Sequence, residues 1–433
     1  MRLRSERGSG PGCTGRNDEA VTDSCEVLVV GAGLAGLQCA RELQAAGREV
    51  VVWEASDAVG GRIRTDRVDG FLVDRGFQVL NPAYPAVRQW VDVDALALQA
   101  FGAGLRVRLP ESLAVLAHPL REPGLILQTL RSGILTPRAV AGLLRWAVPA
   151  FAGPLRRSGQ DVALRDALDR AGCSGELRTV VQRFLAGVLL EDVGSTSNDF
   201  ALQLVRVFAT GVPGVPRDGM QALPQQLADG LAAPVRTSTR VEKITPDGNG
   251  ALVTASGTAI RARHVVLAAD PVDAARLAGS EAPAMKGVLT HWFAADSAPT
   301  DARMLCIDGR TRPGGPLLNA AVISNSAPSY APAGRHLIQT SALFGAGRPV
   351  PSDADVLRHA GDIFGCSTAG WELVARHEIP DALPHQPPPL RTRQPVEGPD
   401  GITVCGDHRE TASIQGALVS GHRAALAVLG RPG

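Results

Sequence analysis

Three glycines near the N-terminus have the spacing of a loop that holds a diphosphate. They lie in residues 31–36, which read GAGLAG. Gly31 would allow a tight turn, Gly33 would let the backbone approach a pyrophosphate, and Gly36 would let a following helix pack closely. The N–H groups and the dipole of that helix would then receive the phosphate charge.

The elements around these glycines complete the pattern of a dinucleotide-binding unit. Residues 26–30 form a short apolar run that predicts a buried strand, and residues 49–53 predict a second one. Leu37 and Leu43 recur at helical spacing between them. Glu54 ends the second strand, where it would accept hydrogen bonds from ribose hydroxyls and repel a 2′-phosphate. The alternative is a chance glycine turn, but strand, glycines, helix, strand and acid occur in order.

The segment after Glu54 indicates which dinucleotide is bound. Gly60-Gly61-Arg62 would turn tightly beside the cofactor, and the Arg62 guanidinium would fork onto the pyrophosphate. At this point the sequence resembles the superfamily of flavin amine oxidases, protoporphyrinogen oxidases and phytoene desaturases. The resemblance implies that the cofactor is FAD. The alternative is a surface Gly-Gly-Arg turn.

Two further segments resemble the same superfamily. In residues 73–79, the resemblance implies that Gly76 brings backbone past the flavin ring, while Phe77 and Gln78 line the ring or simply pack. Residues 220–270 predict a helix to Leu227 followed by strands at 235–244, 251–255 and 264–268. The resemblance places Val241 against the adenine, whereas its residue type equally suits an ordinary sheet valine.

The C-terminal segment predicts a strand that delivers Gly406 and Asp407, followed by a helix that begins near Ser413. Ser413 or Thr411 would cap this helix. The resemblance implies that Asp407 approaches the polar chain of the flavin and that the helix N-terminus points at the isoalloxazine carbonyl, where it would stabilise a reduced, anionic flavin. The alternative is a plain capped terminal helix.

The predicted cofactor-binding residues are therefore Gly31, Gly33, Leu34, Ala35, Gly36, Glu54, Gly61, Arg62, Gly76, Phe77, Gln78, Val241, Gly406, Asp407, Ser413, Ile414, Gln415 and Ala417. The expected fold is α/β, with a Rossmann-type FAD-binding domain of the glutathione-reductase type interleaved with an α+β substrate domain. Residues 24–80, 214–270 and 394–433 would form the first domain, and residues 81–213 and 271–393 the second.

Composition argues against several other classes of protein. A net charge of +1 provides no general attraction for nucleic acid. The seven cysteines form no CxxC pair, which disfavours a metal site or a disulfide framework and suits the cytoplasm. No apolar run reaches membrane-spanning length. Residues 1–23 lack the apolar core of a signal peptide, so we expect a disordered tail or a misplaced start codon.

The two inserts are expected to build the substrate domain. The first is predicted to be mainly helical, and the second is predicted to contribute strands near 289–293, 317–323 and 336–343. Residues 113–157 are apolar and dotted with arginine. We interpret them as a helical lid with a solvated basic face, and the alternative is a peripheral membrane contact or a tunnel for an apolar substrate.

The predicted function is an FAD-dependent oxidoreductase, namely an oxidase, dehydrogenase or desaturase that moves hydride from a small apolar or amine-type substrate to flavin N5. The alternatives are a flavin-dependent isomerase of a carotenoid-like substrate and a non-enzymatic FAD-binding protein. The scarcity of tyrosine, with only Tyr84 and Tyr330, disfavours a simple amine substrate. Because no second complete glycine motif occurs, reoxidation by oxygen, a quinone or a partner protein is expected.

No catalytic residue is assigned from the sequence. His291, Trp292, Trp371 and His408 are expected to be structural, and Lys286 does not match a flavin-proximal lysine well enough to be assigned that role. The resemblance implies that covalent FAD needs a cysteine in the loop before the terminal motif. Cys405 lies in the strand instead, so we expect noncovalent FAD.

Overall fold

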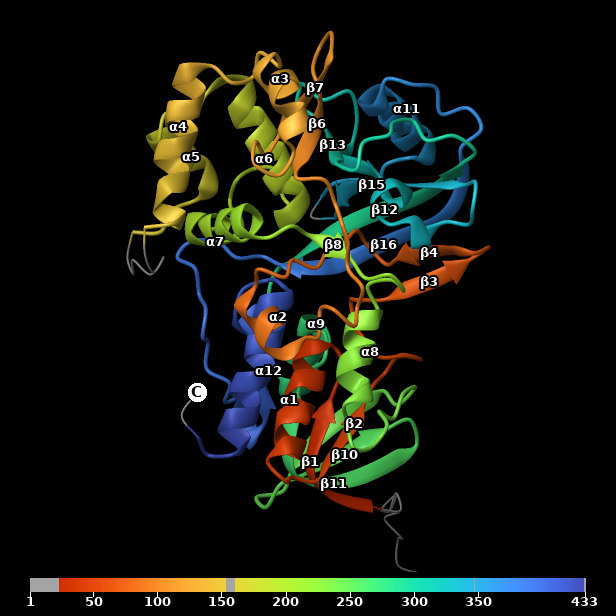
Figure 1. The fold of residues 1–433 in the computed structure, drawn as a ribbon. Coiled ribbons are helices and arrows are strands. Elements are labelled where there is room, and N and C mark those ends of the chain that lie inside the picture. The colour runs from red at the N-terminus through yellow and green to blue at the C-terminus, as the bar shows by residue number, and fades with distance from the viewer. Residues whose placement is uncertain (1–22, 153–159, 346, 432–433) are drawn as a thin grey trace, which may run out of the picture.

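A computed structural model describes residues 23–152, 160–345 and 347–431, and it has two parts that lie end to end (Figure 1). One part is built around a six-stranded sheet and the other around a seven-stranded sheet. The predicted N-terminal tail lies outside the described residues except for Asp23. The first strand begins at Asp23, so the prediction for this residue is wrong.

The six-stranded sheet carries the predicted dinucleotide unit. Its order is β2-β1-β11-β10-β9, and β17 pairs with β11. The strands β2, β1, β11 and β17 run parallel, so their carboxyl ends meet at one edge. The bounds are β1 (Asp23–Val30), β2 (Val50–Trp53), β9 (Val241–Pro246), β10 (Ala251–Ala255), β11 (Thr258–Leu267) and β17 (Thr403–Val404).

The strand predicted at 235–244 begins only at Val241. Arg236 forms a single bridge with Trp53, and Ser238 has a φ of 52°, which a strand does not continue through. The strand predicted at 264–268 is the second half of β11, which begins earlier, at Thr258, and pairs there with β10. The remaining predicted runs of this sheet form strands. The predicted Rossmann-like parallel sheet is therefore confirmed.

Two helices pack closely against each other beside this sheet. They are α1 (Leu34–Ala45) and α12 (Ile414–Val428). A Cβ added at Gly421 of α12 would overlap the carbonyl oxygen of Ala35 in α1. Glycine at position 421 therefore lets α12 approach α1 closely. Against them lie α2 (Pro85–Trp90) and α8 (Ala222–Asp229), while α9 (Pro271–Ala278) packs on the other face of the sheet.

The seven-stranded sheet has the order β16-β12-β15-β14-β13-β6-β7 and is mostly antiparallel. Its bounds are β6 (Gly104–Arg108), β7 (Leu113–Ala117), β12 (Met285–Ala295), β13 (Leu305–Asp308), β14 (Leu317–Val322), β15 (His336–Phe344) and β16 (Glu372–Pro384). The strands predicted in the second insert are confirmed. All six residues of β14 are buried, because α11 (Asp353–Phe364) and α6 (Gly175–Leu189) both contact this strand.

The first insert is mainly helical, as predicted. Its helices are α3 (Ile126–Leu130), α4 (Pro137–Ala147), α5 (Leu164–Arg170), α6 and α7 (Asn198–Thr210), which gather beside the seven-stranded sheet (Figure 1). The insert also contains the hairpin β6–β7. Its strand β6 pairs with β13, so the hairpin extends the seven-stranded sheet. Residues 153–157 of the predicted lid lie outside the described residues.

Short elements join the two parts. They are the ribbon β3 (Thr65–Val68) and β4 (Phe71–Asp74), the pair β5 (Gln99–Ala100) and β8 (Gly214–Val215), and the helix α10 (Ile323–Ser326). Within the described part of the chain, every helix is too short or too polar to span a bilayer.

Candidate functional site

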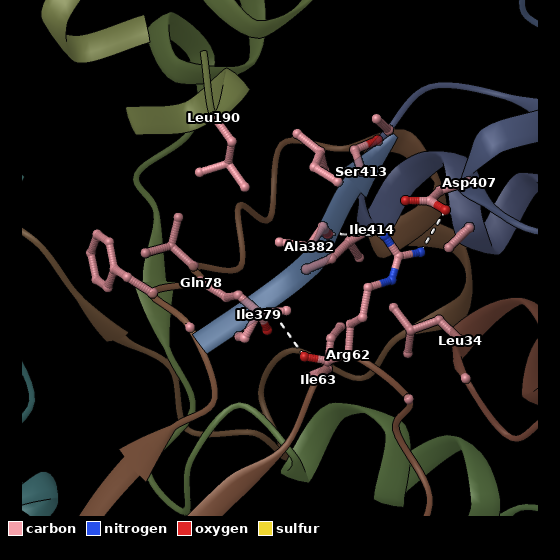
Figure 2. Close-up of a pocket in the computed structure, with 18 of the residues that line it drawn as sticks. Leu34, Arg62, Ile63, Gln78, Leu190, Ile379, Ala382, Asp407, Ser413 and Ile414 are labelled. Atoms are coloured by element: carbon pink, nitrogen blue, oxygen red, sulfur yellow. Dashed lines mark hydrogen bonds and ion pairs between the residues drawn. The ribbon is translucent and has the colours of Figure 1, made fainter. Parts of the chain in front are cut away.

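One cavity of about 860 Å³ extends from the six-stranded sheet to the seven-stranded sheet. Every predicted cofactor-binding residue lines it except Gly36 and Gln415. The residues come from widely separated segments: Figure 2 shows Leu34 and Arg62 from the N-terminal segment facing Asp407 and Ile414 from the C-terminal one. The fold therefore brings most of the predicted residues to the wall of one cavity.

The turn between β1 and α1 lies at one end of this cavity. Gly31 has a φ of 106°, and a Cβ there would lie 2.6 Å from the carbonyl oxygen of Ala268. By contrast, nothing lies within 4 Å of a Cβ added at Gly33. No side chain caps the start of α1, so its first N–H groups are free to face a ligand. This turn therefore leaves space and donors for an anion.

Gly36 does not line the cavity. A Cβ at this position would overlap the carbonyl oxygen of Gly31, so its role is to let the first turn of α1 pack under the glycine loop. This is the packing role that the motif predicts. Because Gly36 is not among the residues that line the cavity, the structure offers no support for a direct contact between Gly36 and the cofactor.

Glu54 anchors the same turn. Its carboxylate oxygens accept hydrogen bonds from the N–H groups of Ala32 (2.7 Å) and Ser56 (2.8 Å). The side chain is buried at the cavity wall, and each oxygen retains a lone pair for a ligand hydroxyl. Val241 is also buried and lines the cavity from β9.

Arg62 and Asp407 form an ion pair in the middle of the cavity (Figure 2). Nη2 of Arg62 lies 2.6 Å from Oδ1 of Asp407, and its Nη1 donates to the carbonyl oxygen of Ala382 at 3.0 Å. Burial would lower the pKa of the guanidinium, but the charge of Asp407, the hydrogen bond to it and the charges of Asp270 and Asp381 together outweigh burial, and the pKa is raised. Arg62 therefore stays charged. Each of its two Nη atoms donates one hydrogen bond within the protein and has a second N–H left for a ligand.

Gln78 packs against this pair. Its Nε2 donates to the carbonyl oxygen of Arg62 at 2.9 Å, while its buried Oε1 has no partner. An unsatisfied buried acceptor beside a cavity indicates a place for a ligand donor. Phe77, next along the chain, contacts Phe101 edge-on with ring centroids 6.0 Å apart.

The N-terminus of α12 faces the cavity. Oγ of Ser413 accepts a hydrogen bond from the N–H group of Gly416 at 3.1 Å, so the predicted cap is confirmed. Ile414 and Ala417 line the cavity beside it. Gln415 points elsewhere, because its Oε1 accepts a hydrogen bond from the N–H group of Ala86 at 2.8 Å. The structure thus places the Gln415 side chain away from the cavity, and a cofactor contact by this residue stays a prediction.

Much of the remaining wall comes from residues that the sequence did not single out. They are mostly apolar and come from the helices of the first insert and the seven-stranded sheet, as with Phe184, Leu190, Leu204, Phe208, Val288, Leu305 and Ile379. We call this part the apolar chamber. Among the described lining residues the only acids are Glu54, Asp270, Asp273 and Asp407, and none of them belongs to the chamber. No local motif marks such a wall, because its residues meet only after folding.

Two polar side chains lie among these apolar residues. Asn319 of β14 is 3% exposed, and its Oδ1 has no hydrogen-bond partner. Tyr84 is the one tyrosine of the two that lines the cavity, and burial raises its pKa to about 12. Tyr330 is instead buried elsewhere and donates its hydroxyl to Oδ2 of Asp74 at 2.9 Å.

The other candidate side chains do not reach the cavity. His291 bonds Asp353 at 2.9 Å, and Trp292 donates to the carbonyl oxygen of Asp74 at 3.1 Å. Nζ of Lys286 donates to the carbonyl oxygen of Leu189 at 2.9 Å, and burial lowers its pKa to about 8. Trp371 and His408 are likewise absent from the lining.

A separate group of Asp308, His359 and Asp362 has the composition of a metal site. Arg310 occupies it instead, pairing with both carboxylates. His359 bonds Oδ2 of Asp308 at 2.9 Å, and its Nδ1 accepts a hydrogen bond from the N–H group of Leu317 at 2.9 Å. The group is therefore a satisfied network that ties α11 to the sheet.

The fold and the cavity together define a dinucleotide-dependent oxidoreductase with a Rossmann-like sheet and a separate chamber. The family described as flavin containing amine oxidoreductase matches residues 34–429. The chain belongs to this family, and its members are FAD-dependent oxidoreductases. The predictions of an enzyme of this class and of its superfamily are confirmed.

Individual relatives share only part of the chain. Coproporphyrinogen III oxidase of Propionibacterium freudenreichii is 30% identical over 189 residues, which are 42% of this chain and 35% of the relative. Phytoene dehydrogenase of Streptomyces griseus is 29% identical over 258 residues, 52% of this chain and 50% of the relative. The matches thus span no more than half the length of these relatives.

Solved structures share the fold across nearly the whole chain. Putrescine oxidase bound to putrescine has a TM-score of 0.66 and 20% identity, covering 94% of this chain and 99% of its own. An oxidoreductase from Methanosarcina mazei has a TM-score of 0.69 and 17% identity, covering 94% and 100%. At these identities the likeness shows the fold alone.

The residues in the cavity fit the FAD that the family implies. The open space at Gly33, the uncapped start of α1 and the unpartnered Oε1 of Gln78 all face one continuous space. Glu54 and the apolar chamber line this same space.

Proposed function

We propose that the protein binds FAD noncovalently in this cavity and oxidises a small, predominantly apolar substrate held in the apolar chamber. The observation that carries the proposal is the continuity of the chamber with the Glu54 end, combined with the absence of carboxylates among the described residues of the chamber wall. When bound, the flavin supplies a hydride acceptor at N5.

Each end of FAD has matching residues. Glu54 would bind the ribose hydroxyls, and the N-terminus of α1 with Gly33 would bind the diphosphate. Val241 would pack on the adenine. Arg62, paired with Asp407, would keep one guanidinium face for the diphosphate. The N-terminus of α12 would direct its dipole at the ring and favour negative charge there.

The division of labour between the segments is also a proposal. Residues 24–80, 214–270 and 394–433 would hold FAD, and residues 81–213 and 271–393 would hold the substrate. The composition of the two sheets supports this division, since β1, β2, β9, β10, β11 and β17 build one and β6, β7 and β12–β16 build the other.

The protein's contribution to the reaction is orientation and exclusion of water. The chamber wall would press the substrate against the flavin, and the reacting C–H bond would need no base from the chain for hydride transfer. A neutral donor suits this wall better than a cation, because burying an ammonium without a carboxylate is costly.

The substrate class can be tested by anaerobic flavin bleaching. We expect apolar donors, such as a carotenoid precursor or a reduced tetrapyrrole, to bleach the flavin of the purified protein. We expect putrescine to leave its absorbance unchanged. Rapid bleaching by putrescine alone would overturn the proposal.

Noncovalent attachment is supported by the environment of Cys405. This thiol is fully buried, lies outside the cavity lining, and has a pKa raised by burial to about 12. It is therefore a poor nucleophile toward a flavin. Acid precipitation should release all the FAD into the supernatant, and flavin in the pellet would refute this point.

Reoxidation is proposed to use oxygen or a quinone. The described cysteines are all free thiols, which suits a cytoplasmic protein.

A peripheral membrane contact is supported by Leu120, Leu127 and Leu130, which are 87%, 63% and 66% exposed next to the chamber. Flotation with phosphatidylglycerol vesicles, lost in a triple Leu→Ser variant, would test it; no flotation of the wild type would refute it.

A further inference from the structure

Two basic side chains line the cavity at the end away from the six-stranded sheet. They are His118 and Arg121, in the segment that follows β7. The N–H group of His118 donates to the carbonyl oxygen of Ala103 at 2.8 Å. Phe101, two residues before Ala103 in the chain, contacts Phe77. The pair therefore borders the apolar chamber beyond Phe77.

Arg121 is fixed in place by the end of α7. Its Nη1 donates to the carbonyl oxygen of Gly211 at 3.1 Å, and its Nη2 donates to that of Ala209 at 3.1 Å. These bonds use two of the five N–H donors of the guanidinium. The side chain is thus held rigidly, with donors remaining for a further acceptor.

The charge of Arg121 has no carboxylate partner within the described residues. None of the four acids that line the cavity belongs to the apolar chamber. His118 adds a further donor, since its Nδ1 accepts the N–H group of Leu120 at 3.3 Å and the ring proton then lies on Nε2. A partly buried cation without an ion-pair partner among the described residues, beside an apolar chamber, indicates an anionic ligand group.

We propose that the substrate carries a carboxylate, which Arg121 and His118 bind while its apolar body extends through the chamber toward the flavin. This inference rests on the proposed function and names the substrate class more closely. It makes Arg121 a specificity-determining residue that holds the substrate by one end. The rigid guanidinium favours a planar, bidentate carboxylate partner.

The test uses the purified FAD-bound protein and three probes of equal chain length: decanoate, 1-decanol and decylamine. Binding is measured by calorimetry and by perturbation of the flavin absorbance. Decanoate should bind at least about tenfold more tightly than 1-decanol, the size expected of a charge-assisted contact. Arg121→Gln should remove this advantage and leave the affinity for 1-decanol unchanged, since glutamine still donates to a carbonyl.

Arg303→Gln provides the matched control. Nη2 of Arg303 donates to the carbonyl oxygen of Ala100 at 3.0 Å, but Arg303 does not line the cavity. This variant should keep the decanoate preference. Equal binding of decanoate and 1-decanol by the wild type would overturn the inference even if Arg121→Gln failed to fold, as would an advantage that survives Arg121→Gln. Tightest binding of decylamine would overturn the proposed function as well.

Discussion

The substitution Gly33→Ala should separate cofactor binding from protein stability. Gly33 has φ −74° and ψ 176°, which alanine adopts without strain, and nothing lies within 4 Å of the added methyl group. The free energy of unfolding of the cofactor-free protein should therefore stay constant or rise by about 0.4–1 kcal/mol, because alanine restricts the unfolded chain.

The same methyl group would occupy the space that we assign to the diphosphate. Each hydrogen bond to a charged group contributes about 1.5–3 kcal/mol, so loss of one would weaken FAD binding about 10-fold to 150-fold. The apparent dissociation constant should be measured by quenching of FAD fluorescence, and stability by urea denaturation of the cofactor-free protein.

Gly36→Ala is the matched control, since its methyl group would overlap the carbonyl oxygen of Gly31 within the protein itself. This variant should lose stability by about 1–3 kcal/mol as well as FAD affinity. The reasoning about Gly33 is refuted if Gly33→Ala binds FAD as the wild type does, or if its cofactor-free form unfolds at lower urea concentration.

Three further predictions concern buried groups. Burial raises the pKa of Asp74 to about 6, so the folded state favours its neutral form. The stability of the wild type relative to Asp74→Asn should therefore fall by about 2 kcal/mol between pH 4 and pH 7 in urea titrations, and an unchanged difference would contradict this. Gly421→Ala should lower the thermal midpoint by several degrees, because its methyl group overlaps the carbonyl oxygen of Ala35; an unaltered midpoint would show that α1 and α12 can separate freely. Cys405→Ser should retain releasable FAD, and loss of all bound flavin would point to a direct role of the thiol.

Long-range agreement between distant motifs explains why the sequence predicted much of the site. The glycine loop, Glu54, Arg62 and Asp407 each depend on a local turn or strand end that the neighbouring residues specify. The parallel strands β1, β2, β11 and β17 bring those ends to one edge. Motifs that terminate such strands are therefore predictable from order alone.

Prediction was weaker where orientation depends on packing. Gln415 lies between two residues that line the cavity, yet its side chain turns away to bond the N–H group of Ala86, which is 329 residues earlier. The strand expected from Val235 begins at Val241, because Ser238 adopts a left-handed backbone conformation. Neither outcome has a local signal in the sequence.

The sequence by itself determined that a glycine loop, an acid and a capped terminal helix would form, because each follows from spacing over a few residues. Only the tertiary structure decided the character of the substrate end. The apolar chamber and the uncompensated charge of Arg121 arise from helices and strands that are far apart in the chain. Their neighbours are set by packing of whole elements, which no single segment encodes.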